Sequence, residues 1–251
     1  MKSESPATWA DQLIDGISWV WLDLDDTLID FHANSAIALS LLYERCCLKY
    51  YFRSEEEWKE SYYAHNKLLW ERYNRGEITQ SHLRLDRFVA PVKPKWTSSL
   101  TELEELSREM DPLYLDLLAE QTNMIPGAVD LLKHLRARDY NIGVLSNGFT
   151  DVQHKKLRVN GLDSLIDIMV LSDDIGVNKP DTRLYEYAMS KVHEPDPGRH
   201  IMIGDNPDTD IKGAIDAGWK AILLDPSAPE GLSAADRHAV TSSLTKITHL
   251  F

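Results

Sequence analysis

Short apolar runs alternate with helical segments along the chain, and this alternation limits the possible folds more than any other feature. One run spans residues 17–22, and four more span 141–146, 168–171, 201–204 and 221–224. Short runs rich in β-branched and aromatic side chains are typical of buried strands. Because helical stretches separate the later runs, the pattern predicts an α/β fold with a parallel, Rossmann-like sheet and helices on both faces.

The segment between the first two runs has a different character and is expected to be all helical. Ser54 and Ser99 each begin a Ser-x-x-Glu pattern, the signature of a helix N-terminal capping box. Apolar side chains recur at helical spacing behind both boxes. Pro91 marks a loop, and Pro112 is expected to kink or restart a helix. We therefore predict a core made of residues 1–30 and 124–251, with a helical cap of residues 31–123 inserted after the first strand.

The acidic composition narrows the possible partners. Lys and Arg total 27 against 40 Asp and Glu, so the formal net charge is −13. A surface of this sign repels phosphate backbones, and we expect no nucleic-acid polymer as a partner. A small phosphorylated metabolite meets the same repulsion, so its site must contain a local cation.

The cysteines and the N-terminal segment bear on location. Cys46 and Cys47 are adjacent, an arrangement that rarely forms a disulfide. Two thiols, no secretory signal in residues 1–16 and no stretch of ~20 apolar residues indicate a cytoplasmic protein without a membrane span. We expect a monomer or a homodimer.

Polar side chains follow three of the predicted strands, and a lysine precedes a later helix. Ligands of parallel α/β sheets bind beyond the carboxyl ends of the strands. We therefore expect these residues to meet at one edge of the sheet: Asp23, Asp25, Thr27, Ser146, Asn147, Gly148, Lys179, Asp205 and Asp210.

Four of these residues are carboxylates, namely Asp23, Asp25, Asp205 and Asp210. Crowded carboxylates cannot all remain ionised without a cation. Since no His or Cys accompanies them, the ligands are hard oxygens, which favour Mg²⁺. The positive charges of Mg²⁺ and Lys179 would also offset the repulsion between this acidic protein and a phosphorylated substrate.

Phosphoryl transfer assigns a role to each group. Asp23 can act as the nucleophile, and Asp25 can donate a proton to the leaving oxygen and later accept one from water. Ser146 and the loop amides at 147–148 can donate to the phosphoryl oxygens, while Lys179 offsets their charge. Taken singly, each motif also fits an ordinary turn, a helix cap or a surface lysine. Their joint occurrence favours chemistry.

The motifs resemble those of the haloacid dehalogenase superfamily. They occur in its order: Asp23-x-Asp25-x-Thr27, Ser146, Lys179 and Gly204-Asp205-x4-Asp210. The likeness covers residues 18–28 and 125–224, and the helical insert resembles the type-1 cap of that superfamily. The resemblance implies an aspartyl-phosphate mechanism with Mg²⁺ held by Asp23, the Asp25 carbonyl and Asp205. It also implies that Asp210 supports the metal shell or orients Lys179.

A narrower resemblance concerns the cap. The stretch from Asn66 to Thr79 and the segment Leu145–Thr150 are similar to the noncanonical pyrimidine 5′-nucleotidases. This implies a pyrimidine nucleoside monophosphate as substrate. Asn66 and Trp70 are the expected contacts to it, because an amide can pair with a pyrimidine edge and an indole can stack on a base. Aromatic side chains at this helical spacing also fit a packed core. The sequence departs from the usual pattern at Pro207, which removes a backbone donor after Asp205.

Other functions fit the same motifs. The main alternative is a phosphatase for a sugar phosphate or phosphoglycolate, because only cap residues separate these substrates. Asp25 argues against a dehalogenase, which lacks the second acid of the first motif in this superfamily. A phosphomutase would need to protect its aspartyl-phosphate from water, and an inactive binding module would have a broken motif.

Overall fold

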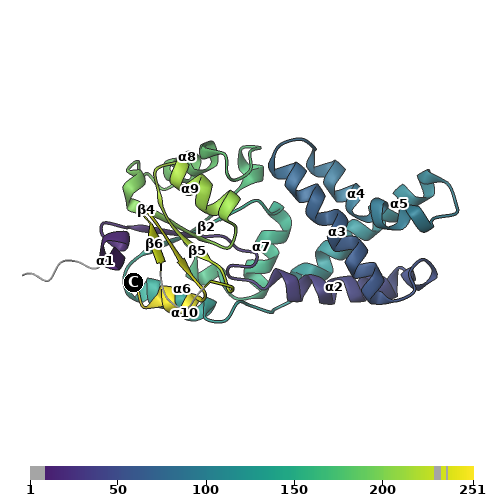
Figure 1. The fold of residues 1–251 in the computed structure, drawn as a ribbon, viewed down its shortest axis with the longest axis horizontal. Helices are drawn as coiled ribbons and strands as arrows, with labels where there is room; N and C mark the ends of the chain where they lie inside the picture. The colour runs from purple at the N-terminus through teal and green to yellow at the C-terminus, as the bar shows by residue number, and fades with distance from the viewer. Residues whose placement is uncertain (1–8, 229–232, 236) are drawn as a thin grey trace, which may run out of the picture. The chain divides into compact units, whose positions relative to one another are not determined.

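The computed structural model describes residues 9–228, 233–235 and 237–251. The chain forms two compact units (Figure 1). The α/β unit comprises the chain up to Asp30 together with Met124–Thr150 and Asn160–Phe251, and the helical unit comprises Phe31–Asn123 and Asp151–Val159. The second stretch of the helical unit, Asp151–Val159, begins three residues after Gly148 of the Ser146-Asn147-Gly148 motif.

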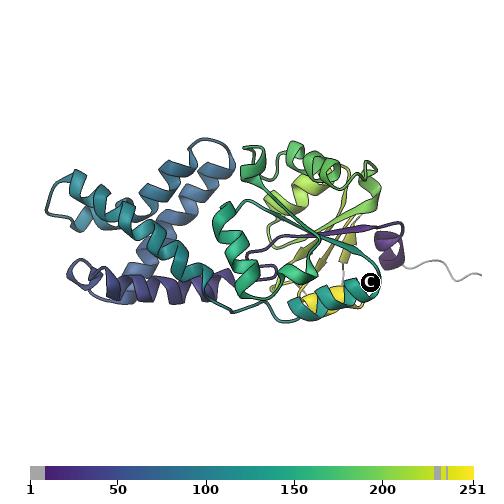
Figure 2. The same cartoon turned by 180° about the vertical axis from the view of Figure 1, so that it is seen from behind.

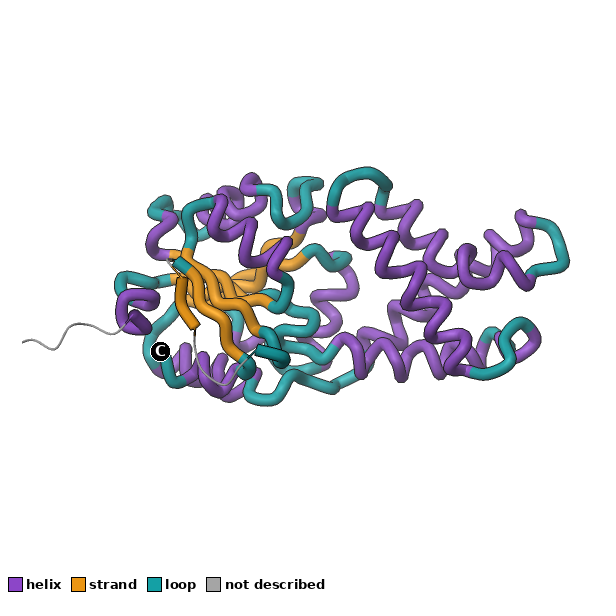
Figure 3. The backbone as a smooth tube through the Cα atoms, in the orientation of Figure 1, coloured by secondary structure: helices purple, strands orange, loops and turns teal. Residues whose placement is uncertain are grey.

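The α/β unit is built on one sheet, drawn in orange in Figure 3. Its strand order is β3-β2-β1-β4-β5-β7-β6, and every neighbouring pair is parallel except β6 and β7. The strands are β1 (Trp19–Leu22), β2 (Asn141–Ser146), β3 (Ile168–Leu171), β4 (His200–Gly204), β5 (Lys220–Leu224), β6 (Ser233–Ala235) and β7 (His238–Thr241). The α/β prediction is confirmed, and β6 and β7 are additions to the expected sheet.

Strand β1 lies between β2 and β4, and its register suits the shapes of the side chains that meet there. Trp21 lies opposite Gly143 of β2 and Met202 of β4. A β-carbon on Gly143 would lie 2.4 Å from the Trp21 ring, so only glycine leaves room for this fully buried indole. Trp21 also donates a hydrogen bond from Nε1 to Nδ1 of His200 at 3.0 Å. The apolar run is thus buried by its neighbours on both sides.

Helices cover both faces of this sheet. Figures 1 and 2 show α8 and α9 on one face and α6 and α10 on the other. The helices of the unit are α1 (Trp9–Ile14), α6 (Ala128–Ala137), α8 (Thr182–Lys191), α9 (Lys212–Asp216) and α10 (Leu244–Thr248). Because the strands from β1 to β5 are parallel, their carboxyl ends lie together at one edge of the sheet, where ligands of such sheets bind.

The helical unit is formed by α2 (Phe31–Arg45), α3 (Glu55–Asn74), α4 (Gln80–Val92) and α5 (Leu100–Ala119), with most of α7 (Thr150–Val159). Ser54 accepts a hydrogen bond from the Glu57 amide, and Ser99 forms a complete capping box. The loop expected at Pro91 is wrong, because Pro91 lies within α4. Helix α5 also continues through Pro112 without restarting. The buried side chains around each proline fix the helix by packing, which outweighs one lost backbone bond.

Aromatic side chains form the core of the helical unit. Tyr62 lies 5.7 Å from Trp58, 5.5 Å from Phe88 and 5.5 Å from Tyr114, measured between ring centroids. Trp58 and Tyr62 are fully buried, as expected for core residues. Across the part of the chain that the structure describes, no helix combines the length and apolar character needed to cross a membrane.

Candidate active site

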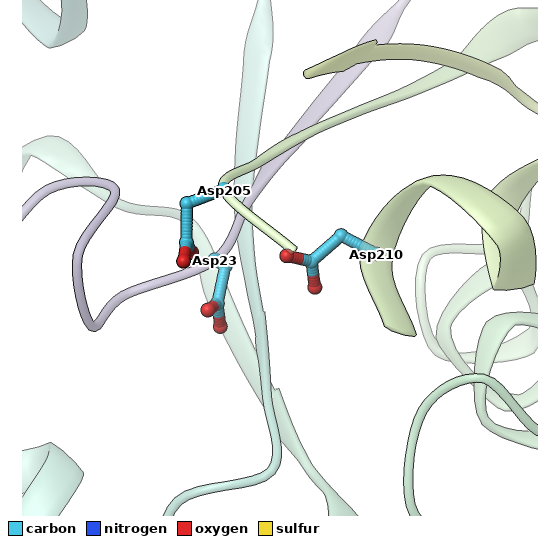
Figure 4. A group of neighbouring side chains, drawn as sticks. All are labelled: Asp23, Asp205 and Asp210. Atoms are coloured by element: carbon cyan, nitrogen blue, oxygen red, sulfur yellow. The ribbon is translucent and has the colours of Figure 1, made fainter. Parts of the chain in front are cut away.

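Three of the predicted metal ligands, Asp23, Asp205 and Asp210, meet at the carboxyl edge of the sheet. Asp23 directly follows β1, and its amide donates to the Ile203 carbonyl of β4 at 2.9 Å, which extends the strand pairing to the site. Asp205 directly follows β4, and Asp210 lies in the wide helical turn Pro207–Ile211 before α9. Figure 4 shows the carboxylates of Asp23, Asp205 and Asp210 converging from these segments.

Three carboxylates and one lysine form a compact charged cluster. Oxygens of Asp23, Asp205 and Asp210 all lie within 4.8 Å of one another. Lys179 Nζ donates to Asp23 at 2.8 Å, to Asp210 at 2.6 Å and to the Leu145 carbonyl at 2.7 Å. A lysine has three donors, so all of them are used here. The Lys179 side chain is only 2% exposed and Asp210 is fully buried, so solvent screens this cluster weakly.

Burial and mutual repulsion perturb the charges of the cluster. Burial raises the pKa of Asp23 to about 7, against the attraction of Lys179 and with added repulsion from Asp210. Burial and then the charge of Asp23 raise the pKa of Asp205 to about 8. For Lys179, burial favours the neutral form, but Asp210 and Asp23 more than offset it, so the pKa of Lys179 lies above its ordinary value. The site is therefore short of positive charge.

The donor set fits a hard divalent cation. The clustered ligand atoms are carboxylate oxygens, and the cluster includes no sulfur or imidazole ligand among the described residues. A cation placed among these oxygens would return Asp23 and Asp205 to their ionised forms. The two oxygens of Asp210 already accept protein hydrogen bonds, from Lys179 Nζ and from the Asn206 amide at 3.0 Å. Asp23 and Asp205 are therefore the better placed ligands.

The geometry of the turn after β4 accounts for Gly204 before it and Pro207 within it. A β-carbon on Gly204 would lie 2.3 Å from Asp210 Oδ2, so glycine is required for Asp210 to approach the strand end. Asn206 caps the turn, because its Oδ1 accepts from the amides of Asp208 and Thr209. Pro207 is the first residue inside this turn, where a missing N–H leaves no bond unmade. The departure at Pro207 therefore suits the turn.

The first motif folds into a tight turn after β1. The amides of Leu28 and Ile29 both donate to the Leu24 carbonyl, at 3.0 and 2.9 Å. Asp26 has a positive φ of 58°, a conformation that Asp tolerates better than most residues. Thr27 is buried and donates from Oγ1 to Asp205 Oδ1 at 3.1 Å, so it contacts a predicted metal ligand. Asp25 is half-buried, and its carboxylate is not part of the three-carboxylate cluster.

The second motif joins the cluster through Lys179. Ser146 ends β2, and its Oγ accepts from the Gly148 amide at 3.1 Å. The side chain of Asn147 bonds to the backbone of Lys179 in two places, with Oδ1 accepting from the amide at 2.8 Å and Nδ2 donating to the carbonyl at 3.1 Å. These residues lie at the predicted edge, and their contacts to a substrate remain predictions.

The predicted substrate contacts of the cap, Asn66 and Trp70, both lie on α3 of the helical unit. Asn66 is 6% exposed, and its Oδ1 has no hydrogen-bond partner among the described residues. Trp70 is half-buried and packs edge-on against Tyr73, with ring centroids 5.5 Å apart. Their contact with a substrate remains a prediction.

One residue that sequence reasoning missed is Tyr185. Its hydroxyl donates to the carbonyls of Thr209 at 2.9 Å and Asp210 at 3.1 Å. Its ring occupies the space above Gly213, where a β-carbon would lie 2.5 Å from it. No motif marks a tyrosine in the middle of α8, so only the packing of α8 against the turn reveals this contact.

Known proteins resemble this chain in sequence and in fold. A family model described as haloacid dehalogenase-like hydrolase matches residues 17–218. Pyrimidine 5′-nucleotidase YjjG of Escherichia coli is 31% identical over 86% of this chain and 90% of its own length. Pyrimidine 5′-nucleotidase PynA of Streptococcus pneumoniae is 30% identical over 81% of this chain and 82% of its own. The magnesium-bound structure of the putative HAD-hydrolase YfnB of Bacillus subtilis, 26% identical, superposes with a TM-score of 0.79 over 93% of this chain and 98% of that chain.

Proposed function

Because this chain belongs to the haloacid dehalogenase-like hydrolase family, we propose that it is a Mg²⁺-dependent 5′-nucleotidase that hydrolyses pyrimidine nucleoside monophosphates through an aspartyl-phosphate. The observation that carries this proposal is the buried contact of Lys179 with Asp23 inside the three-carboxylate cluster. Such a cluster combines a nucleophile, a fixed positive charge and ligands for a cation, which are the requirements of phosphoryl transfer.

The residues divide the reaction into two steps. In the first, an oxygen of Asp23 forms a bond to phosphorus, the bond to the leaving nucleoside oxygen breaks, and Asp25 gives that oxygen a proton. In the second, Asp25 takes a proton from water as the water oxygen bonds to phosphorus, which releases phosphate and frees Asp23. Lys179 and the donors around Ser146 offset the charge on the phosphoryl oxygens.

Asp23 and Asp205, with the backbone carbonyl of Asp25, would hold the cation. When bound, Mg²⁺ supplies positive charge that offsets the repulsion between a phosphate and this acidic site. Thr27 orients Asp205 through their 3.1 Å hydrogen bond. Asp210 accepts hydrogen bonds from Lys179 Nζ and from the Asn206 amide, and so holds the lysine next to Asp23.

The substrate class rests on the relatives named as pyrimidine 5′-nucleotidases. Asn66 and Trp70 are the proposed contacts to the base, because Asn66 Oδ1, which has no hydrogen-bond partner in the part of the chain that the structure describes, can accept a hydrogen bond, and an indole can stack. The alternative is a phosphatase for a sugar phosphate or phosphoglycolate. It is supported by a relative named glyceraldehyde 3-phosphate phosphatase, 36% identical over 42% of this chain.

The nucleophile is tested by Asp23→Asn. The amide keeps the shape of the side chain but cannot attack phosphorus, so we expect turnover to fall at least ~1,000-fold with the fold retained. Phosphate release and circular dichroism measure the two effects. The matched control is Asp216→Asn, an exposed aspartate paired with Lys212, which should retain wild-type activity. Near-normal turnover in Asp23→Asn would exclude Asp23 as the nucleophile.

The substrate is tested with a panel of phosphomonoesters in the presence of Mg²⁺, using Asp23→Asn as the blank. We expect UMP, dUMP and dTMP to be hydrolysed with higher kcat/KM than AMP, GMP, sugar phosphates or phosphoglycolate. Loss of that preference in Asn66→Ala or Trp70→Ala would support the proposed base contacts. A preference for sugar phosphates or phosphoglycolate would retain the mechanism and reject the nucleotidase assignment.

A further inference from the structure

The loop after β2 contains a side chain whose hydrogen bonds point to a function other than substrate binding. We propose that Asn147 is a positioning residue, which fixes the backbone of Lys179 so that its ammonium group stays between Asp23 and Asp210. This inference rests on the proposed function, in which Lys179 offsets the charge of the nucleophile and the phosphoryl group. It gives the Asn147 side chain the role of supporting the lysine, separate from the backbone amides at 147–148 that are expected to donate to the phosphoryl oxygens.

The geometry is a paired contact between one amide and one residue. Asn147 Oδ1 accepts from the Lys179 amide at 2.8 Å, and Nδ2 donates to the Lys179 carbonyl at 3.1 Å. The side chain therefore satisfies both backbone groups of a single residue, as a neighbouring strand does in a sheet. Two bonds to the same residue resist both translation and rotation of its backbone, which one bond does not.

The far end of Lys179 shows why such a restraint matters. Lys179 Nζ is held at 2.8 Å from Asp23, 2.6 Å from Asp210 and 2.7 Å from the Leu145 carbonyl. A lysine side chain has four rotatable carbon–carbon bonds, so a shift of its backbone changes where the ammonium group can reach. Misplacement of a catalytic group by ~1 Å can cost ~100-fold in rate.

The two loops that meet here come from distant parts of the sequence. Asn147 follows β2, and Lys179 precedes α8, whose first turn is capped by Asp181. In β2 itself, Leu145 supplies the carbonyl that accepts from Lys179 Nζ. The strand end thus contacts Lys179 at both its backbone and its ammonium group, with Leu145 and Asn147 only two positions apart in the chain. The end of β2 and the loop after it therefore restrain both ends of the Lys179 residue.

The first test is Asn147→Ala, with kcat and KM measured separately. A positioning role predicts that kcat falls roughly 10- to 100-fold while KM changes less than about threefold. Asn147→Asp retains an acceptor for the Lys179 amide, so it should recover part of kcat. Asn141→Ala is the matched control, since Asn141 lies at the exposed opposite end of β2 and its side chain donates to the Ser18 carbonyl.

A double-mutant cycle with Lys179→Ala distinguishes support of the lysine from a direct contact. If Asn147 acts through Lys179, adding Asn147→Ala to Lys179→Ala causes little further loss of kcat. A raised KM with unchanged kcat in Asn147→Ala, full additivity in the cycle, or no effect at all would each overturn the inference. If wild-type protein hydrolyses no phosphomonoester, the proposed function fails instead, so the two failures are distinguishable.

Discussion

Lys179 and Asp210 are charged side chains that are buried together. Lys179 and Asp210 are 2% and 0% exposed, and each makes its contacts inside the α/β unit. A buried ion pair is costly to break, because removing one partner leaves an uncompensated charge out of water. Lys179 is also bonded to Asp23, so the stability of the pair and the charge state of the proposed nucleophile are set by the same atoms. Substitutions here should therefore change activity and stability together.

Gly204→Ala tests how tightly Asp210 is placed. The added carbon would lie 2.3 Å from Asp210 Oδ2, which is held by the Asn206 amide, so the carboxylate must move away from the strand end. We expect a loss of ~1–3 kcal/mol in the free energy of unfolding, typical of overpacking, and a fall in kcat of at least ~10-fold. Urea unfolding and phosphate release measure these effects.

Gly198→Ala is the control for that substitution. Gly198 is exposed, and its added carbon would meet only the carboxylate of Asp196, at 3.2 Å. We expect near wild-type stability and turnover. Equal behaviour of the two alanine variants would contradict the tight placement of Asp210.

Among the elements, helix α8 connects the lysine to the turn that contains Asp210. Asp181 caps its N-terminus by accepting from the Arg183 amide, and this fixes where the helix begins, at Thr182, three residues after Lys179. One turn further along, Tyr185 bonds to the Thr209 and Asp210 carbonyls. Helix α8 therefore helps to position both Lys179 and Asp210, the two partners of the buried ion pair.

Tyr185→Phe tests this connection, because it removes the hydroxyl and keeps the ring. Two backbone carbonyls lose a donor, so we expect ~1–2 kcal/mol of lost stability and a several-fold lower kcat. Tyr187→Phe on the same helix is the control, since Tyr187 is only partly buried and makes no such bond to the turn. The two free energies of unfolding, measured with denaturant, should differ. If Tyr185→Phe matches the control, the hydroxyl has no role in holding the turn.

On the scale of the whole molecule, the folding energy should depend on pH and on Mg²⁺ together. The folded pKa values of Asp23 and Asp205 are raised to about 7 and about 8, mainly by burial. Between about pH 4 and pH 8 these two carboxyl groups bind more protons in the folded protein than in the unfolded chain, so without metal their contribution to stability falls as pH rises. Mg²⁺ binds the ionised carboxylates and should reverse this loss.

We expect the increase in melting temperature caused by Mg²⁺, relative to EDTA, to be larger at about pH 8 than at about pH 5.5. Asp205→Asn removes one proposed ligand and should abolish most of this increase. Differential scanning calorimetry measures both. An increase of equal size at the two pH values would contradict the linkage between the metal and these carboxylates.

The helical unit shows where local rules reach their limit. The capping boxes at Ser54 and Ser99 are local signals and mark real helix starts. Pro91 and Pro112 are local signals too, yet α4 and α5 continue past them, because tertiary packing outweighs one missing backbone bond.

The strands β6 and β7 of the α/β unit were not predicted, since short segments gain their stability from neighbouring strands.

The α/β class, the five main strands and the positions of the polar motifs follow from the residue pattern alone, because strand and helix periods and strand-end side chains are local properties. The contacts between those motifs arise only when the chain is folded. The bond from Lys179 to Asp23 spans 156 positions, and Asn147 reaches the Lys179 backbone across 32. Such contacts depend on strand order and loop approach, and periodicity contains no information about either.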